Sequence, residues 1–357
     1  MNALRNLKEE AQYDLVAPTS MGVRLTPADR QQVSTSHQFT MQATSAESNV
    51  LSVSASLGLR TKVLTAFVKG SPISRFIQSE LRSRNIAYEG PERDAGGPWG
   101  YRHQINFSES GFGVRGAQVH NDRAGEVGRT LSVRDFDLDR LFEKEGVRIL
   151  HLSGLVAALS PETSQFCLEL VRRAKQSGTL ISFDMNYRES FWKGREQELS
   201  TVFSEIASLS DILMNYQPTD AQGIPETLSL NPEQIDTFID LVHRVHQQYP
   251  DAQLITSTVR GEQNANENLW GAVMLTNDRW YIEPARTIPV LDRIGGGDGF
   301  ASGVLYGILA GYTDPQKWLE LGWASGAMAV TTLTDYIQPD SEAMLQRIYS
   351  GQARIKR

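Results

Sequence analysis

Strand-like and helix-like segments alternate along most of this chain, and this alternation limits its possible folds more than any other feature. Short apolar runs predict strands at residues 13–17, 62–68, 148–153, 180–184, 211–214 and 253–258. Runs with helical periodicity predict helices at residues 48–57, 74–85, 137–143, 161–177, 195–209 and 232–248. Such alternation is typical of an α/β fold with a doubly wound, mainly parallel sheet. Because these sheets bind ligands beyond the carboxyl ends of their strands, we expect the functional residues in the loops there.

Two irregular stretches interrupt the alternation. Four short runs in them predict strands between polar loops, at residues 23–25, 39–42, 104–107 and 117–121. A Pro- and Gly-rich segment at residues 88–100 predicts a loop. We interpret the four short strands as a small sheet outside the main one, a β lid formed by about residues 22–42 and 100–121. Since no repeat or low-complexity linker divides the chain, residues 1–357 are expected to form a single domain with this lid.

Composition excludes several classes of function. The chain has 35 Lys and Arg against 42 Asp and Glu, a formal charge of −7, whereas a nucleic-acid-binding protein normally carries a basic patch. Its single cysteine, Cys167, cannot form an internal disulfide or a cysteine-rich metal site, and its apolar neighbours predict a buried helix position. The charged first 15 residues lack the apolar core of a signal peptide, and no apolar run is long enough for a transmembrane helix. We therefore expect a cytoplasmic protein that binds neither nucleic acid nor membranes.

The strongest local motif is a glycine-rich turn followed by an aspartate. Gly295, Gly296 and Gly297 lie between a strand predicted at 287–291 and an apolar helix. Their bare backbone N–H groups and the helix N-terminus suit an anion such as a phosphoryl group. Asp298 would lie in the first helical turn, where its carboxylate can accept a proton from an attacking hydroxyl. In the simpler alternative, Asp298 is only a helix cap and the glycines only form a turn.

This turn also resembles a known family signature. Residues 292–298 (DRIGGGD) are similar to the D-x-x-G-x-G-D turn of the ribokinase-like (PfkB) carbohydrate kinases, most closely in the 2-keto-3-deoxygluconate kinase branch. Six further segments resemble that branch, at residues 24–27 (RLTP), 46–50 (AESNV), 121–125 (NDRAG), 151–154 (HLSG), 183–188 (FDMNYR) and 264–268 (NANEN). The resemblance extends from about residue 13 to residue 350 and implies a ribokinase-like fold.

The resemblance implies an ATP-dependent kinase for a sugar or sugar acid, such as 2-keto-3-deoxygluconate. Asp298 matches the catalytic base, and Gly295, Gly296 and Gly297 match the anion hole. Asn49 matches a residue that faces the sugar. Arg188 matches the arginine that pairs with the carboxylate of sugar acids, since a planar guanidinium binds a carboxylate with two hydrogen bonds. Because Arg188 follows the strand that ends at Asp184, we expect its side chain to lie buried or half-buried over the ligand end of the sheet, where it needs an anionic partner. The alternative for Arg188 is a surface or helix-capping arginine.

The nucleotide and its cations are assigned in the same way. The residues that match the ATP site are Thr258, Arg260, Asn266, Asn268 and Ser325, although Ser325 is equally compatible with close helix packing. Asp292 matches a position where relatives often bind a monovalent cation such as K⁺, and a turn-capping aspartate is an equal alternative. The N-x-x-E motif that often organises Mg²⁺ reads Asn-Tyr-Gln-Pro here, with Pro218 in place of the glutamate. Asp220 is a candidate to replace that carboxylate.

Three departures from the family fall on the substrate side. Thr19 and Ser20 replace Gly-Glu, Thr44 and Ser45 replace Gly-Gly, and Asn106 replaces a lid tyrosine that often contacts the substrate. Side chains in place of glycines would narrow or reshape the substrate pocket. A kinase for a neutral sugar, or a sugar- or nucleotide-binding homologue with weak catalysis, therefore stays open. We also expect a homo-oligomer formed through the lid, because small exposed sheets tend to cover their edges by pairing.

Overall fold

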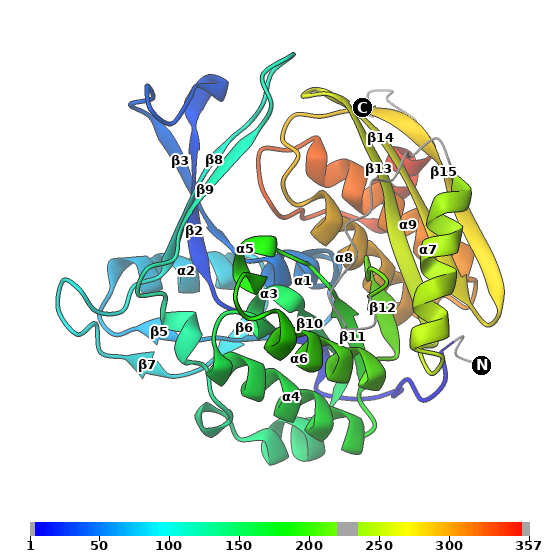
Figure 1. The fold of residues 1–357 in the computed structure, drawn as a ribbon, viewed down its shortest axis with the longest axis horizontal. Helices are drawn as coiled ribbons and strands as arrows, with labels where there is room; N and C mark the ends of the chain where they lie inside the picture. Colours follow the sequence, from blue (N-terminus) through cyan, green and yellow to red (C-terminus); the bar gives the residue numbers. More distant parts are fainter. Residues whose placement is uncertain (1–3, 220–234, 352–357) are drawn as a thin grey trace.

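The computed structural model describes residues 4–219 and 235–351, and it contains one large twisted sheet with helices on both faces (Figure 1). The sheet has nine strands: in order, β15 (Arg279–Pro289), β14 (Glu267–Thr276), β13 (Leu254–Asn264), β12 (Ile212–Met214), β11 (Leu180–Asp184), β10 (Val147–Ser153), β1 (Tyr13–Pro18), β4 (Thr61–Leu64) and β6 (Ile86–Glu89). Each neighbouring pair from β13 to β6 is parallel. The predicted α/β class with a doubly wound, mainly parallel sheet is therefore confirmed.

Both edges of the sheet differ from the prediction. At one edge β6 was not predicted as a strand, and the larger difference lies at the other edge. Residues 254–289 form an antiparallel meander of β13, β14 and β15, whereas the sequence predicted only a strand at 253–258 and another at 287–291. In β14 nearly every residue is buried or half-buried, because helices cover this edge too. A strand that is buried on both faces does not alternate between apolar and polar residues, so its periodicity carries no strand signal.

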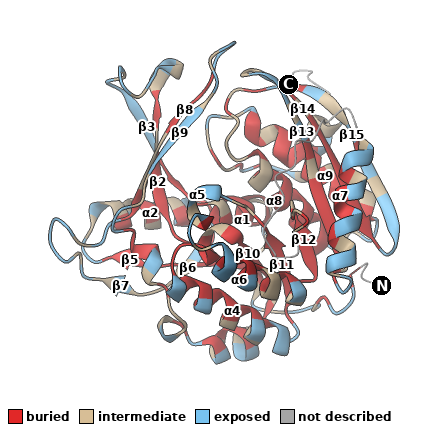
Figure 2. Ribbon diagram, viewed as in Figure 1, coloured by how far each residue is buried: buried red, intermediate tan, exposed pale blue. Residues whose placement is uncertain are grey.

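The helices form two layers, each with its own apolar core. One face is covered by α1 (Ala46–Ser56), α2 (Pro72–Ser83), α8 (Gly296–Leu309), α9 (Pro315–Val330) and α10 (Glu342–Tyr349). The other is covered by α3 (Gly154–Ala157), α4 (Pro161–Gln176), α6 (Glu196–Leu209) and α7 (Ile235–Gln248). Figure 2 shows the central strands and the helix faces against them as buried, whereas the edge strand β15 is mostly exposed or half-buried. Cys167 lies in α4 and is fully buried, as its apolar neighbours predicted.

The boundaries of two predicted helices differ from the structure. The helix predicted at 137–143 is a π-helix at Arg140–Glu145, which runs two residues past the predicted end and stops at Gly146, where φ is 77°. The first three residues of the helix predicted at 232–248 lie outside the described residues, and α7 is described from Ile235.

The lid is a separate sheet of four strands. Its order is β3 (Phe39–Thr44), β2 (Gly22–Pro27), β8 (Gln104–Glu109) and β9 (Gln118–Asp122), close to the four predicted strands. The Pro- and Gly-rich segment between its two halves is not all loop, since β5 (Phe67–Val68) pairs there with β7 (Glu92–Arg93). Figure 1 shows the lid rising beside the carboxyl ends of the parallel strands. This arrangement leaves a space between lid and sheet, which holds the candidate site.

The two faces of the lid differ in character. In β3 the side chains of Gln42 and Thr44 bond to the segment around Asp335, so they face the main sheet. Because side chains alternate along a strand, Phe39 and Met41 point away from it, and both are exposed. On β3, therefore, the outer face of the lid is apolar and the inner face is polar.

Candidate active site

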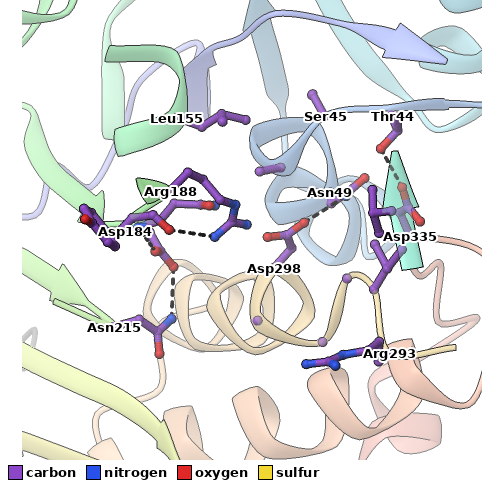
Figure 3. A pocket seen from close by; sticks show the side chains of 18 of the residues that line it. Thr44, Ser45, Asn49, Leu155, Asp184, Arg188, Asn215, Arg293, Asp298 and Asp335 are labelled. Carbon is purple, nitrogen blue, oxygen red and sulfur yellow. Dashed lines mark hydrogen bonds between the residues drawn. The ribbon is translucent and has the colours of Figure 1, made fainter. Parts of the chain in front are cut away.

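A cavity of about 790 Å³ lies between the lid, the carboxyl ends of the central strands and the start of α8. Polar and charged side chains from all three line it, and Figure 3 shows them converging on Asp298. The prediction that the site lies beyond the strand ends is therefore consistent with the geometry.

The glycine turn forms the floor of this cavity. Gly295 has φ 85°, and a Cβ atom there would lie 2.2 Å from the carbonyl oxygen of Asp335, so only glycine fits. α8 begins at Gly296, and a Cβ on Gly297 would meet no atom within 4 Å. The backbone at the helix N-terminus is thus open to the cavity, which is the geometry that binds anions.

Asp298 lies in the first turn of α8, as the sequence predicted. Its Oδ2 accepts a hydrogen bond of 2.9 Å from Asn49 Nδ2 on α1. Burial raises the pKa of the Asp298 carboxyl to about 7, and the Asn49 hydrogen bond opposes that rise. The nearby carboxylates of Asp184 and Glu47 raise it further. A carboxyl group with this pKa can exchange a proton near neutral pH, which is what a general base requires.

Asn49 is placed by the capping of its helix. Ser45 is the N-cap of α1, and its hydroxyl accepts a hydrogen bond of 3.1 Å from Ser48 N. Asn49 follows in the first turn and reaches across to α8. The sequence assigned Asn49 to the sugar, and the structure adds a contact with the predicted base. Thr44 and Ser45 also line the cavity, as does Asn106 from the lid.

Arg188 faces Asp298 from the opposite wall (Figure 3). Its guanidinium donates a hydrogen bond of 3.0 Å to the carbonyl of Tyr187, and it forms no ion pair within the described part of the chain. The argument that Arg188 would be buried, and so would need an anionic partner, is wrong. The loop after β11 turns out toward the cavity, and the side chain is exposed there. A guanidinium in this position is available to an anionic ligand.

A chain of hydrogen bonds connects the ends of three strands beside the glycine turn. Asn215, after β12, donates from Nδ2 to Asp184 Oδ2 at 3.0 Å, and Asp184 ends β11. Asn215 Oδ1 accepts from both the backbone N and the hydroxyl of Thr258 on β13, each at 3.0 Å. Burial raises the pKa of Asp184. The sequence analysis assigned no site role to Asp184 and noted Asn215 only as the first residue of the altered N-x-x-E motif. The signal was their position, since Asp184 ends one predicted strand and Asn215 directly follows another.

The residues predicted to bind ATP divide into a first group at the large cavity and a second group that lies elsewhere. Thr258 and Arg260 line the cavity. Asn268 lines a smaller cavity of about 440 Å³ between the lid tip and the β13–β14 turn, and Asn266 Oδ1 accepts a hydrogen bond of 2.6 Å from Gly113 N of that tip. Ser325 is fully buried between α8 and α9, where a Cβ on Gly303 would lie 2.6 Å from its hydroxyl oxygen. The structure therefore brings only the first group to the large cavity.

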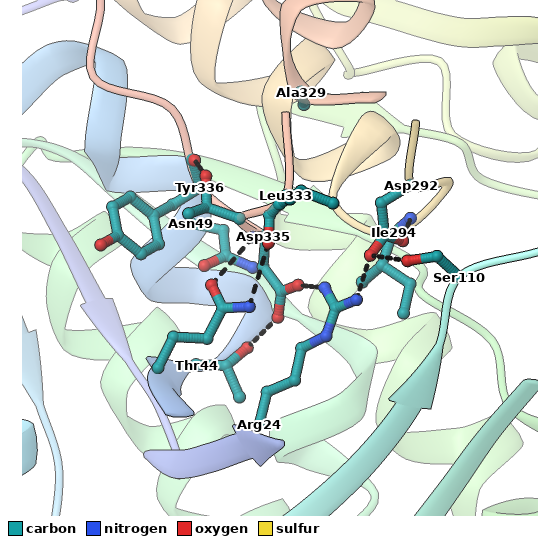
Figure 4. Close-up of polar contacts among 12 residues, drawn as sticks. Arg24, Thr44, Asn49, Ser110, Asp292, Ile294, Ala329, Leu333, Asp335 and Tyr336 are labelled. Atoms are coloured by element: carbon teal, nitrogen blue, oxygen red, sulfur yellow. Dashed lines mark hydrogen bonds and ion pairs between the residues drawn. The ribbon is translucent and has the colours of Figure 1, made fainter. Parts of the chain in front are cut away.

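Asp292, the predicted cation ligand, is buried and paired with an arginine of the lid. Arg24 Nη2 donates to Asp292 Oδ2, and Ser110 donates to the same oxygen at 3.1 Å (Figure 4). Asp292 Oδ1 accepts from Ile294 N at 3.1 Å and so also caps the turn. Arg24 and Asp335, which both line the cavity, were not predicted as site residues. Asp220 lies outside the described residues.

Comparisons with known proteins agree with this geometry. The profile of the pfkB family carbohydrate kinases matches residues 15–340. A 2-dehydro-3-deoxygluconokinase of Bacillus subtilis is 29% identical over 320 residues, which cover 89% of each chain. The 5-dehydro-2-deoxygluconokinase of Clostridium perfringens is 29% identical over 214 residues, 59% of this chain and 56% of that protein, so the match spans just over half of that relative. The crystal structure of 2-dehydro-3-deoxygluconokinase from Thermotoga maritima has the same fold, with a TM-score of 0.85, 24% identity and coverage of 95% and 100%.

The raised pKa of Asp298 leads to a prediction for the ligand-free protein. In a pH titration followed by carboxyl-carbon NMR, we expect Asp298 to change protonation near pH 7 rather than near the ordinary pKa of aspartate. Asn49→Ala should move the titration to higher pH, because the Asn49 hydrogen bond favours the charged form. A midpoint close to that of an exposed aspartate in the same spectra would contradict the burial argument.

Proposed function

Because the chain belongs to the pfkB family of carbohydrate kinases, we propose that it transfers the γ-phosphoryl group of ATP to a hydroxyl of a sugar acid, either 2-keto-3-deoxygluconate or a close relative. The observation that carries this proposal is the position of Asp298, half-buried at the helix N-terminus beside three glycines and bonded to Asn49. A proton acceptor next to an open anion-binding turn is the pair of groups that phosphoryl transfer to a hydroxyl needs.

The proposed reaction uses this pair directly. The substrate hydroxyl lies beside Asp298 and loses its proton to the carboxylate as its oxygen bonds to the γ-phosphorus. The bond from the γ-phosphorus to the β–γ bridging oxygen breaks at the same time, and ADP leaves with that oxygen. The backbone N–H groups of residues 295–297 stabilise the charge on the transferred group. Asn49 orients the carboxylate through its hydrogen bond.

The nucleotide phosphates are proposed to lie between the glycine turn and the strand ends, near Thr258 and Arg260. Kinases of this family use ATP with a divalent metal, and Mg²⁺ is usually bound by one or two carboxylates together with phosphate oxygens and water. The Asp184 carboxylate on the cavity wall fits that demand, since each of its oxygens accepts only one hydrogen bond, from Asn186 N or from Asn215 Nδ2, and an oxygen can accept two. Asn215 orients this carboxylate, because its own Oδ1 already accepts two bonds from Thr258. When bound there, the metal would neutralise phosphate charge. Asp184 thus replaces the missing glutamate at Pro218 in this proposal.

The cavity chemistry favours a polyhydroxylated acid as substrate. Arg188 offers a carboxylate an exposed guanidinium that has no ion-pair partner among the described residues. Three amide oxygens on the cavity wall have no hydrogen-bond donor among the described residues, those of Asn49, Gln104 and Asn106. Buried acceptors without a partner are costly, and sugar hydroxyls are suitable donors for them. The names of the relatives, kinases for 2-dehydro-3-deoxy and 5-dehydro-2-deoxy acids of gluconate, agree with this class.

The outer face of the lid supports a proposal about assembly. Phe39 and Met41 are exposed there, and Phe107 contacts Phe39 edge to face. We propose that a second copy of the chain covers this apolar face. We also propose a cytoplasmic location, where ATP is supplied. Among the described helices none has the length and apolarity to cross a bilayer.

The reaction is tested by a coupled phosphorylation screen of sugar acids and neutral sugars, with Asp298→Asn beside the wild type. We expect turnover with 2-keto-3-deoxygluconate or a related acid, and a loss of at least about 100-fold in kcat for Asp298→Asn because the proton acceptor is removed. ATP should still bind, as measured by calorimetry. Asp251→Asn, an exposed position, is the matched control. Preference for a neutral sugar would instead identify a neutral-sugar kinase. ATP binding without turnover on any substrate would identify a sugar- or nucleotide-binding homologue with weak catalysis.

The role of Arg188 is tested by kinetics. Charge-assisted hydrogen bonds are worth about 1.5–3 kcal/mol, so Arg188→Ala should raise KM for the sugar acid by roughly 10-fold or more. KM for ATP should barely change. Arg172→Ala, which removes an exposed arginine paired with Glu205, is the matched control. Equal KM values for the sugar acid in wild type and Arg188→Ala would rule out the carboxylate contact.

The assembly is tested by light scattering at micromolar concentration. We expect a homo-oligomer for the wild type and dissociation for Met41→Glu, because a charge would have to be buried in the interface. Trp99→Glu, at a side chain that is 97% exposed outside the lid strands, should leave the assembly intact. A monomeric wild type would refute the proposal.

A further inference from the structure

A single buried arginine joins two carboxylates next to the glycine turn. Arg24, on lid strand β2, is 1% exposed, and its two terminal nitrogens donate to Asp292 and to Asp335 (Figure 4). Both carboxylates are themselves buried. Two buried carboxylates repel each other and each is costly to desolvate, so this cluster requires a cation between them.

The two carboxylates flank the proposed anion hole. Asp292 begins the turn and holds its backbone through Ile294 N. Asp335 touches the turn from the other side, because its carbonyl oxygen lies where a Cβ of Gly295 would be. Any change in the charge balance of the pair would therefore move the backbone that faces the transferred phosphoryl group.

The sequence resemblance implied that Asp292 binds a monovalent cation, and the structure does not fit that role. Oδ2 of Asp292 already accepts from Arg24 and Ser110, and Oδ1 accepts from Ile294. Asp335 accepts from Arg24 on one oxygen and from the Thr44 hydroxyl on the other, at 2.6 Å. All four carboxylate oxygens thus accept a hydrogen bond within the chain, and the Arg24 guanidinium bridges the two carboxylates, so a small cation could bind both only by displacing it.

We propose that the Arg24 guanidinium takes the place of a dissolved monovalent cation beside the glycine turn, so that this enzyme works without K⁺. The guanidinium carries the same single charge, and its planar fork of N–H groups can bond two carboxylates at once. This inference rests on the proposed kinase function only for its activity readout.

Arg24 is a positioning residue in this proposal, since it acts through Asp292 and Asp335 rather than on the substrate. Its place on β2 has a further consequence. The positive charge comes with the lid, so the glycine turn acquires its cation only when the lid is in the position that the structure shows. Lid placement and anion-hole geometry are then coupled through one side chain.

The test compares KCl, NaCl and tetramethylammonium chloride at equal ionic strength. For the wild type, kcat should differ by less than about twofold among the salts, since screening is the same in all three. Its thermal midpoint should also be the same. Arg24→Ala should lose activity in tetramethylammonium chloride, and KCl should restore part of that activity. KCl should also raise the thermal midpoint of Arg24→Ala, whereas it should leave that of the wild type unchanged. Arg24→Lys, which keeps the charge, should resemble the wild type in its indifference to K⁺.

Arg102→Ala is the control, because it removes a half-exposed arginine paired with Asp122 at the edge of the lid. A wild type that K⁺ activates by about tenfold over tetramethylammonium, or that K⁺ stabilises against heat, would overturn the proposal. So would an Arg24→Ala variant that folds and shows no preference for K⁺. If that variant does not fold, the wild-type comparison decides. If no sugar is phosphorylated in any salt, the proposed function fails, and the wild-type thermal midpoints still decide the question of the cation.

Discussion

The parallel pairing of the strands from β13 to β6 is the constraint on which the site depends. Parallel neighbours all end at one edge of the sheet, so the loops after β11, β12 and β1 meet there although they are far apart in sequence. Asp184 and Asn215 owe their contact to this edge. Asp184 is the last paired residue of β11, opposite Met214 of β12, and Asn215 directly follows Met214. The parallel sheet thus brings these polar groups together at one edge, and the lid and α8 enclose the cavity around them.

Enclosure has a direct electrostatic effect. Asp298 is partly shielded from water at the wall of the cavity, and this burial raises its pKa to about 7. The helix N-terminus and Arg188 favour its ionised form, whereas Asp184 and Glu47 oppose it. The same side chain on an open surface would be a permanently charged and weakly basic group. Its chemical usefulness therefore depends on the surrounding packing as much as on its identity.

The lid contributes chemistry as well as cover. Its inner face brings Arg24, Gln104 and Asn106 to the cavity, while Thr44 at the end of β3 binds Asp335. The residues that replace family glycines are engaged with the protein: the Thr44 hydroxyl bonds Asp335, and Ser45 caps α1. These two departures from the family signature are thus parts of internal hydrogen-bond networks, and they shape the pocket through the groups that they hold in place.

Sequence alone determined the fold class, the lid strands and the glycine turn, because each of these has a local signal. Periodicity indicates a strand or helix, and three glycines before an aspartate indicate an open helix N-terminus. The sequence failed to predict β14, because its two buried faces remove the alternation of apolar and polar residues. It also failed to predict that Arg188 is exposed, because exposure depends on where the loop after β11 turns. Only the tertiary structure decided that Arg24, Asp292 and Asp335 form one cluster, since they lie up to 311 positions apart in the chain. A pattern along the chain reports local conformation, whereas the pairing of charges across such a distance exists only once the lid and the turn have packed together.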